Sequence, residues 1–406
     1  MKNYLLLTAY CLCFILFASC YKTTKYADIP NEYHAMLDTA LLKSGNNRVE
    51  IEKALDKAPK EQKEGMAFLI AYMPEVDLEV LTADFLLENC NYAYKVRKEY
   101  DWCKNLPDSI FFNYVLPYRN INETADNWRK DFYNRFSKYI ENYKDVVDAF
   151  KIINANILYE LNVEYNTKRK KADQSPYESM EINMASCTGL AILLNNALRS
   201  VGIPARLVGI PLWHDMSGNH SWTEIWVDGN WYCTEYGTDA AFDSLWFIQR
   251  AGKSDKNDRM RSIYASSYKP TDISYPLVWD TLNTLTWVKG INVTQYYMDL
   301  AKKYSTDEVK DNEIMVKVWL LKDNKIGLVS DNRIEERIII LKNNKQIDNG
   351  YTANANRDMN DYLYFYLDKN TKYTAQYKNI DGKIKSISFF PKDTLLLYYK
   401  RIQKHT

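Results

Sequence analysis

The chain has 406 residues, of which 46% are apolar and 26% charged, with 53 basic against 52 acidic side chains. These proportions are typical of a soluble globular protein and exclude a disordered polar chain. The net charge of +1 argues against a nucleic-acid binder, because no excess of positive charge is available to neutralise phosphates. The length predicts two or three domains. Histidine is rare, so histidine-dependent chemistry has only four candidates: His34, His214, His220 and His405.

The first 19 residues are typical of a secretory signal. Lys2 precedes an apolar run from 4 to 17, which is too short to span a bilayer as a helix. The run leads into Leu-Phe-Ala-Ser-Cys at 16–20, which resembles the lipobox of bacterial lipoproteins. That resemblance implies that residues 1–19 are removed, that Cys20 carries a lipid, and that the protein is exported and membrane-anchored.

Tyr21 follows the candidate lipid-carrying Cys20, at the position where an Asp would keep a lipoprotein from reaching the outer membrane. Its presence therefore favours the outer membrane, on its periplasmic face or at the cell surface. An ordinary cleaved signal peptide is the alternative. No later segment is apolar enough to be a candidate membrane span.

Seven cysteines occur in the chain, of which two lie in the signal and a third is Cys20. The remaining four are Cys90, Cys103, Cys187 and Cys233. They are too few for a disulfide scaffold in a chain of this size, and they lack the paired Cys-x-x-Cys spacing of a zinc site. The paired-histidine pattern of zinc sites is missing as well, so we expect no metal and no organic cofactor. At least one of the four is a candidate working thiol.

Residues 20–130 are predicted to form a helical N-terminal region. Apolar residues recur at helical spacing within 36–41, 51–55, 66–70 and 76–86. A further helix is predicted over 143–161, at the start of a second domain expected to span 131–300.

The segment that begins at Cys187 is a well-formed amphipathic helix. Its apolar residues fall at helical spacing: Leu190, Leu193, Leu194, Ala197, Leu198 and Val201. Ser186 is a plausible N-cap, and Gly202 and Pro204 end the helix. Cys187 therefore lies in the first turn, where the helix dipole and the free N–H groups favour a thiolate and can also stabilise an oxyanion.

A strand over 205–210 precedes two strands, His220 to Val227 and Asn230 to Glu235, which are joined by a strong two-residue hairpin signal, Asp-Gly, at 228–229. If Val227 faces Asn230, His220 becomes the diagonal neighbour of Glu235, within reach of its carboxylate. A turn at 229–230 would instead place Glu235 opposite Glu224, and a three-residue loop would reverse the faces.

These residues resemble the core of the transglutaminase-like superfamily, a papain-related group of cysteine acyl-transfer enzymes. The resemblance covers about 143–237 and rests on four motifs: Cys-Thr-Gly at 187–189, Arg-Ser-Val-Gly-Ile-Pro-Ala-Arg at 199–206, Asn-His-Ser-Trp-Thr-Glu-Ile-Trp at 219–226 and Asp-Gly-Asn-Trp at 228–231. The flanking chain also resembles exported transglutaminase-like proteins of Bacteroidetes. The implied fold is α+β, with a papain-like core in which a helix packs on an antiparallel sheet.

The resemblance implies a role for each matching residue. Cys187 is the nucleophile, His220 is the base and acid, and Glu235 takes the place of the family's Asp as the carboxylate that orients the imidazole. The second oxyanion donor is left open among three residues upstream of the thiol, namely Gln174, Tyr177 and Asn183. Trp213 and Trp222 are expected to form walls of the core or the site.

Each role has an alternative. Cys187 could simply pack at the start of its helix. His214 could replace His220 as the base, although it lies in the loop 211–218 and not on the patterned strand. Cys233 shares the predicted face with Glu235, but a strand offers no dipole to activate it. We expect it to be a packed residue, or at most a redox partner of Cys187.

The last part of the chain, 310–406, is predicted to form a β-sandwich domain. Short β-type runs at 316–321, 337–341, 362–367, 373–377 and 383–389 are separated by turn signals. Tyr362, Tyr364 and Tyr366 alternate with apolar residues, as expected for a strand with one buried face. Sheet packing explains these tyrosines best, and sugar stacking is the alternative.

Two functions are therefore expected from the sequence. The first is a cysteine enzyme that attacks an amide bond of a peptide, protein or glycopeptide through a thioester, most simply as a peptidase or amidase and otherwise as a transamidase. The second is a lipid-anchored binding or scaffold protein for peptide or glycan, with an inactive core. The substrate and the oligomeric state are left open.

Overall fold

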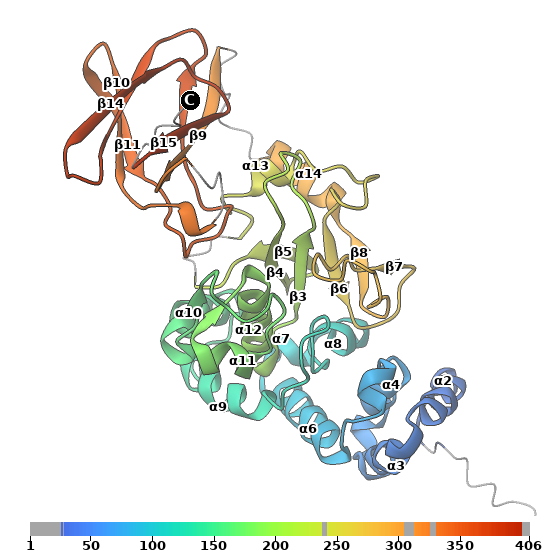
Figure 1. Ribbon diagram of the computed structural model, residues 1–406. Coiled ribbons are helices and arrows are strands. Elements are labelled where there is room, and N and C mark those ends of the chain that lie inside the picture. Colours follow the sequence, from blue (N-terminus) through green and yellow to red (C-terminus); the bar gives the residue numbers. More distant parts are fainter. Residues whose placement is uncertain (1–25, 27, 238–241, 304–311, 325–329, 400–406) are drawn as a thin grey trace, which may run out of the picture. The chain divides into compact units, whose positions relative to one another are not determined.

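The computed structural model describes residues 26, 28–237, 242–303, 312–324 and 330–399 (Figure 1). The predicted signal and Cys20 lie outside these residues. The chain divides into two compact units, Met1–Cys90 and Asn91–Thr406. Among the described residues, none of the helices combines the length and the apolar character that a membrane span requires.

The first unit is helical, as predicted. Its helices are α2 (Asn31–Lys43), α3 (Arg48–Lys57), α4 (Lys63–Ala71), α5 (Glu75–Leu78) and the start of α6 (Ala83–Glu99), with short 3-10 turns at Gly45–Asn47 and Lys60–Gln62. Leu37 and Leu41 of α2, together with Ile51 and Leu55 of α3, are buried. The periodic apolar positions therefore form the core of this unit.

Helices open the second unit and lead to the candidate thiol. They are α7 (Asp101–Lys104), α8 (Asp108–Tyr114), α9 (Arg129–Ile140), α10 (Val146–Leu161), α11 (Pro176–Ile182) and α12 (Cys187–Ser200). Helix α12 begins at Cys187 because the Ser186 hydroxyl accepts a hydrogen bond from the Gly189 N–H at 3.0 Å. It ends before Gly202, which has a φ of +79°. Residues with a β-carbon rarely adopt this conformation. Both predicted caps are confirmed.

A six-stranded antiparallel sheet, in the order β5-β4-β3-β6-β8-β7, carries the site. Its strands are β3 (Ala205–Ile210), β4 (His220–Val227), β5 (Asn230–Thr234), β6 (Tyr264–Ser267), β7 (Ile273–Ser274) and β8 (Lys289–Asn292). Leu207 packs in one core with Ile192 of α12, whereas Val208 packs in another with Tyr297 of α14 (Thr294–Lys303). Because neighbouring strand residues point to opposite faces, α12 covers one face and α14 the other, with α13 (Ile248–Ala251) beside it.

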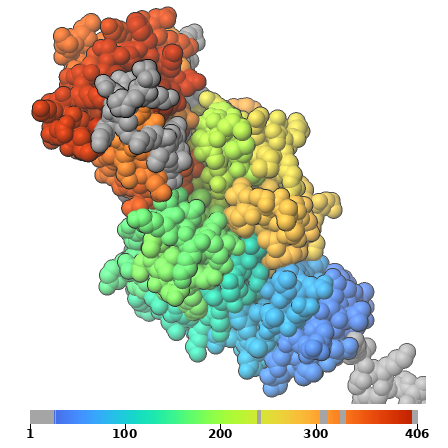
Figure 2. Space-filling model, in the orientation of Figure 1, coloured from blue at the N-terminus to red at the C-terminus, as the bar shows by residue number. Residues whose placement is uncertain are grey.

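The described residues after 312 form seven strands in two sheets, β11-β10-β13-β14 and β12-β9-β15. They are β9 (Glu313–Leu321), β10 (Arg337–Lys342), β11 (Lys345–Tyr351), β12 (Leu363–Asp368), β13 (Tyr373–Lys378), β14 (Ile384–Phe389) and β15 (Thr394–Tyr398). Val316 and Phe365 of one sheet share a core with Ile340 and Ala375 of the other, so the predicted β-sandwich is confirmed. Its residues, coloured orange to red, gather into one body in Figure 2.

The sequence missed two strands of this sandwich, β11 and β15. Strand β11 is mostly polar and exposed along its length, so it has no alternation to detect. In β15 the buried Leu395 and Leu397 flank the partly exposed Leu396, and the unbroken leucine run hides the period of two. Strand β12 does show its alternation, because Phe365 is buried while Tyr364 and Tyr366 are about half exposed.

The close approach at Gly202 gives a stability prediction. A β-carbon there would lie 2.7 Å from Cβ of Cys103, in addition to the strain of a positive φ. Gly202→Ala should therefore lower the free energy of unfolding by about 2–3 kcal/mol, measured by urea denaturation. Gly229→Ala is the control, since its φ is also positive but its β-carbon would meet open space, and it should cost about 1 kcal/mol. Equal losses in the two variants would refute the packing argument.

Candidate active site

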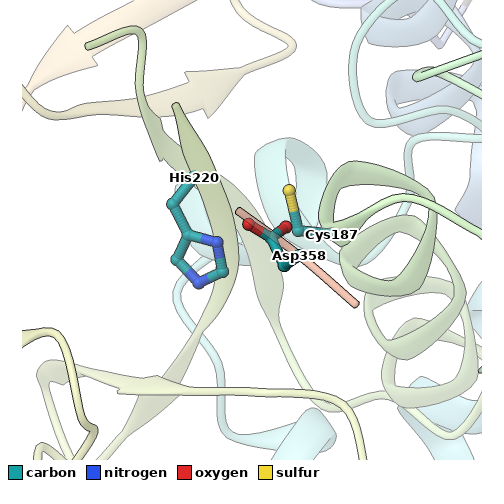
Figure 3. Close-up of side chains that lie close together, drawn as sticks. All are labelled: Cys187, His220 and Asp358. Atoms are coloured by element: carbon teal, nitrogen blue, oxygen red, sulfur yellow. The ribbon is translucent and has the colours of Figure 1, made fainter. Parts of the chain in front are cut away.

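The Cys187 side chain projects from the first turn of α12, at the positive end of the helix dipole (Figure 3). It is partly exposed, whereas Cys90, Cys103 and Cys233 are buried, and none of these four described cysteines forms a disulfide. Thr188, the next residue, holds the helix start against the sheet through a 3.0 Å hydrogen bond to the Ser221 hydroxyl. The thiol that α12 presents therefore sits beside the start of strand β4.

The β4–β5 hairpin has the register that the sequence predicts. Val227 pairs with Asn230 and Thr223 with Thr234, which brings Glu235, just past β5, near His220 at the start of β4. Nε2 of His220 lies 2.6 Å from Oε1 of Glu235. The predicted contact between imidazole and carboxylate is therefore confirmed.

A tryptophan that the sequence did not single out completes the support of the carboxylate. Nε1 of Trp246 donates to Oε2 of Glu235 at 3.1 Å, and its ring centroid lies 5.1 Å from that of His220. Each oxygen of Glu235 thus has a partner, which fixes the plane in which the carboxylate meets the imidazole.

The charge state of His220 reflects these contacts. Burial lowers the pKa of the imidazole, but its interactions with the Cys187 thiol and the Glu235 carboxylate outweigh burial and raise the pKa to about 10. With Nε2 bonded to Glu235, Nδ1 is the nitrogen that faces the thiol, and it makes no other hydrogen bond among the described residues. The site favours an imidazolium beside the sulfur at neutral pH.

Aromatic rings enclose the imidazole, as expected for the two predicted wall residues. Trp213 and Trp222 are parallel to within 4°, and their ring centroids lie 6.3 and 5.8 Å from that of His220. Nε1 of Trp222 donates to the Tyr297 hydroxyl at 2.6 Å, and that hydroxyl donates to Glu224. The wall is therefore anchored to the buried polar groups beneath the sheet.

An acidic side chain that the sequence reasoning missed joins this group. Asp358 lies in the loop between β11 and β12 of the β-sandwich, and Figure 3 shows its carboxylate between the sulfur and the imidazole. A donor atom from each of Cys187, His220 and Asp358 lies within 4.8 Å of the other two. No sequence motif surrounds Asp358, so nothing in the local pattern could have indicated it.

The Asp358 loop is fastened on both sides of the thiol. On one side, the Thr167 N–H and hydroxyl donate to the carbonyls of Asn356 and Ala355 at 3.3 and 3.0 Å. On the other, Nδ2 of Asn360 donates to the carbonyl of Asn219, the residue before His220, at 2.8 Å. The β-sandwich therefore reaches across the candidate site.

The three oxyanion candidates have other partners in the structure. The buried Gln174 amide donates to the carbonyls of Glu178 and Met184, and Asn183 donates to the carbonyl of Asn162. The Tyr177 hydroxyl donates to the carbonyl of Asn127. The structure thus uses these side chains to shape the chain before the thiol.

Neither alternative residue belongs to the cluster of Cys187, His220 and Asp358. His214 is in the loop between β3 and β4 and is not part of the cluster of Cys187, His220 and Asp358. Burial raises the pKa of the Cys233 thiol well above its ordinary value, so Cys233 stays protonated near neutral pH.

Residues 134–235 match the model of the transglutaminase-like superfamily. This stretch is a transglutaminase-like domain. It contains α10, α12 and the β3–β5 strands, and with them Cys187, His220 and Glu235. Asp358 lies outside it, in the β-sandwich.

Two solved structures are similar to parts of the chain. One is a candidate cysteine protease from Cytophaga hutchinsonii, with 21% identity over 35% of this chain and 47% of that protein, and a TM-score of 0.27. The other is red sea bream transglutaminase, with 9% identity over 71% of this chain and 65% of that protein, and a TM-score of 0.29. The chain thus spans less than two thirds of either protein. No curated protein matches it in sequence.

The raised pKa of His220 can be tested by NMR titration of the imidazoles, since the chain has only four histidines. The His220 resonance, assigned with His220→Gln, should titrate near pH 10 in the wild type. Glu235→Gln removes the negative charge that favours the imidazolium, so the pKa should fall by at least about one pH unit. Glu181→Gln, at an exposed carboxylate paired with Lys170, is the control and should leave it unchanged. An unchanged pKa in Glu235→Gln would disprove the coupling.

Proposed function

We propose that the protein is a cysteine hydrolase of amide bonds, in which Cys187, His220 and Glu235 form the catalytic triad. The observation that carries the proposal is the 2.6 Å contact between His220 and Glu235, which leaves Nδ1 of the imidazole directed toward the thiol at the start of α12. Each group of an acyl-transfer site is present: a nucleophile at a helix start, an adjacent acid and base, and a carboxylate that orients it.

The chemistry proceeds in two steps. The Cys187 thiolate attacks the amide carbonyl carbon, and the carbonyl electron pair moves onto oxygen, beside the N–H groups of the first turn of α12. The imidazolium of His220 then gives its proton to the amide nitrogen, so the C–N bond breaks and an amine leaves a thioester behind. His220 next takes a proton from water, the hydroxide adds to the thioester carbon, and the thiolate is released with a carboxylic acid.

Water is the acceptor that we propose, because it is abundant wherever the site is open to solvent. A primary amine could resolve the same thioester and would give transamidation. The proposed substrates are peptides, proteins or glycopeptides of the cell envelope. This setting rests on the lipobox-like segment at 16–20, which predicts an exported, lipid-anchored protein.

The activated nucleophile can be tested by alkylation with iodoacetamide. Cys187 should react near neutral pH at least about tenfold faster than an ordinary thiol, since only its thiolate reacts and its neighbour is a cation. The other three described thiols are buried and should stay unlabelled in the folded protein. Peptide mapping of the wild type, Cys187→Ala and the control Cys233→Ala identifies the labelled residue. Equal labelling of wild type and Cys187→Ala would contradict the assignment.

The alternative, an inactive binding protein, predicts a different result. It requires no reactive thiol, so slow alkylation of Cys187 together with retained binding of envelope peptides by Cys187→Ala would favour it.

A further inference from the structure

We propose that Cys187, His220 and Asp358 form a binding site for Zn²⁺, which ties the β-sandwich loop to the catalytic pair and blocks the thiol. The inference goes beyond amide hydrolysis, and it rests on the juxtaposition of the three side chains rather than on turnover. The sequence offered no zinc pattern, because the donors come from two domains.

The donor set is suited to zinc. A thiolate, an imidazole nitrogen and a carboxylate oxygen are the three ligand types that Zn²⁺ takes in proteins, at about 2.0–2.3 Å from the metal. Here the three donor atoms lie within 4.8 Å of one another, so a small inward movement of the side chains brings all three to one ion. The sulfur makes zinc a better fit than calcium or magnesium, which prefer oxygen ligands.

The imidazole is prepared as a metal ligand. Nδ1 of His220 has no hydrogen-bond partner among the described residues, although the side chain is only 6% exposed. Nε2 contacts Glu235 at 2.6 Å, which is the arrangement in which a carboxylate orients a metal-binding histidine. The same contact that would serve catalysis thus leaves Nδ1 as the nitrogen that gives up its proton and binds the ion.

The third ligand is equally supported. The Asp358 carboxylate accepts hydrogen bonds from the N–H and Nδ2 of Asn360 at 2.7 and 2.9 Å. Burial raises the pKa of the Tyr165 hydroxyl, and the negative charge of the nearby Asp358 carboxylate is the second largest cause of the rise. The carboxylate is therefore held in place beside the thiol.

The charges at the site also call for a cation. A Cys187 thiolate, Asp358 and Glu235 carry three negative charges, and the positive charge of Arg333 interacts with Asp358. Arg333 donates to the main-chain carbonyl of Asp358 at 2.9 Å and not to its carboxylate. When zinc binds, His220 releases the proton on Nδ1, and the divalent ion then offsets the negative charge that remains.

The consequence is a reversible block. Zinc takes up the thiolate lone pair that attacks the substrate, and because Asp358 belongs to the β-sandwich, the ion fastens that domain over the nucleophile. Removal of the ion frees both the thiol and the loop.

The test is Zn²⁺ binding to the metal-free protein, followed by calorimetry and by the thiolate-to-metal absorption of bound Co²⁺. We expect one ion per chain, protection of Cys187 from iodoacetamide, and loss of the Co²⁺ absorption in Cys187→Ser. Asp358→Asn should weaken Zn²⁺ binding by at least about tenfold, the lower range for groups around metal ligands. The control is Asp361→Asn, an exposed carboxylate of the same loop, which should bind as the wild type does.

Several results would overturn the site: no stoichiometric binding by the wild type, or unchanged affinity in either Cys187→Ser or Asp358→Asn. Circular dichroism establishes that each variant is folded. The Co²⁺ spectrum of the wild type tests the sulfur ligand by itself, so this part of the proposal does not depend on a variant. Fast alkylation of Cys187 without zinc binding would refute this site and leave the proposed hydrolase intact. Zinc binding by a protein that forms no thioester would refute the proposed hydrolase and leave this site intact.

Discussion

The arrangement of the site depends on one contact, between Nε2 of His220 and the Glu235 carboxylate. It exists because Asp228 and Gly229 close a two-residue turn, which sets the pairing of β4 with β5 and places both side chains on one face. A slip of one residue would move His220 to the opposite face, so the turn determines whether His220 and Glu235 can meet. The buried chain from Trp222 through Tyr297 to Glu224 then holds β4 in place.

The same contact also determines the charge state of His220. An imidazole that is 6% exposed would ordinarily lose its proton, yet the neighbouring thiol and carboxylate reverse the effect of burial and raise its pKa to about 10. The helix dipole and the imidazolium act on Cys187 from two directions. Asp358 adds a negative charge to this group, and its position across the thiol couples the β-sandwich to the site.

Local patterns made much of this predictable from the sequence. The periodicity of α12, its Ser186 cap and the Asp-Gly turn are signals within a few residues, and they gave the position of Cys187 and the partner of His220. Trp246 and Asp358 were missed for the opposite reason. Trp246 follows the hairpin without a periodic pattern, and Asp358 lies on a loop of the β-sandwich, so its contact with Cys187 depends on packing between segments that are far apart in the sequence.

The polar strand β11 shows the same limit in the fold. Its residues have no alternation of their own, and it forms because β10 offers a partner edge. Long-range packing also accounts for Gln174 and Asn183. Their amides looked available as oxyanion donors in the sequence, but the folded chain uses them to bind main-chain carbonyls.

The most direct test of the proposed hydrolase is the mass of the acyl-enzyme. Metal-free protein is incubated with peptides from cell-envelope extract, quenched in acid and analysed by intact mass and peptide mapping. A thioester mechanism predicts an acyl group on Cys187 of the wild type, and none on Cys187→Ala. Absence of any adduct on Cys187, or an adduct on another residue, would contradict a thioester mechanism at this site.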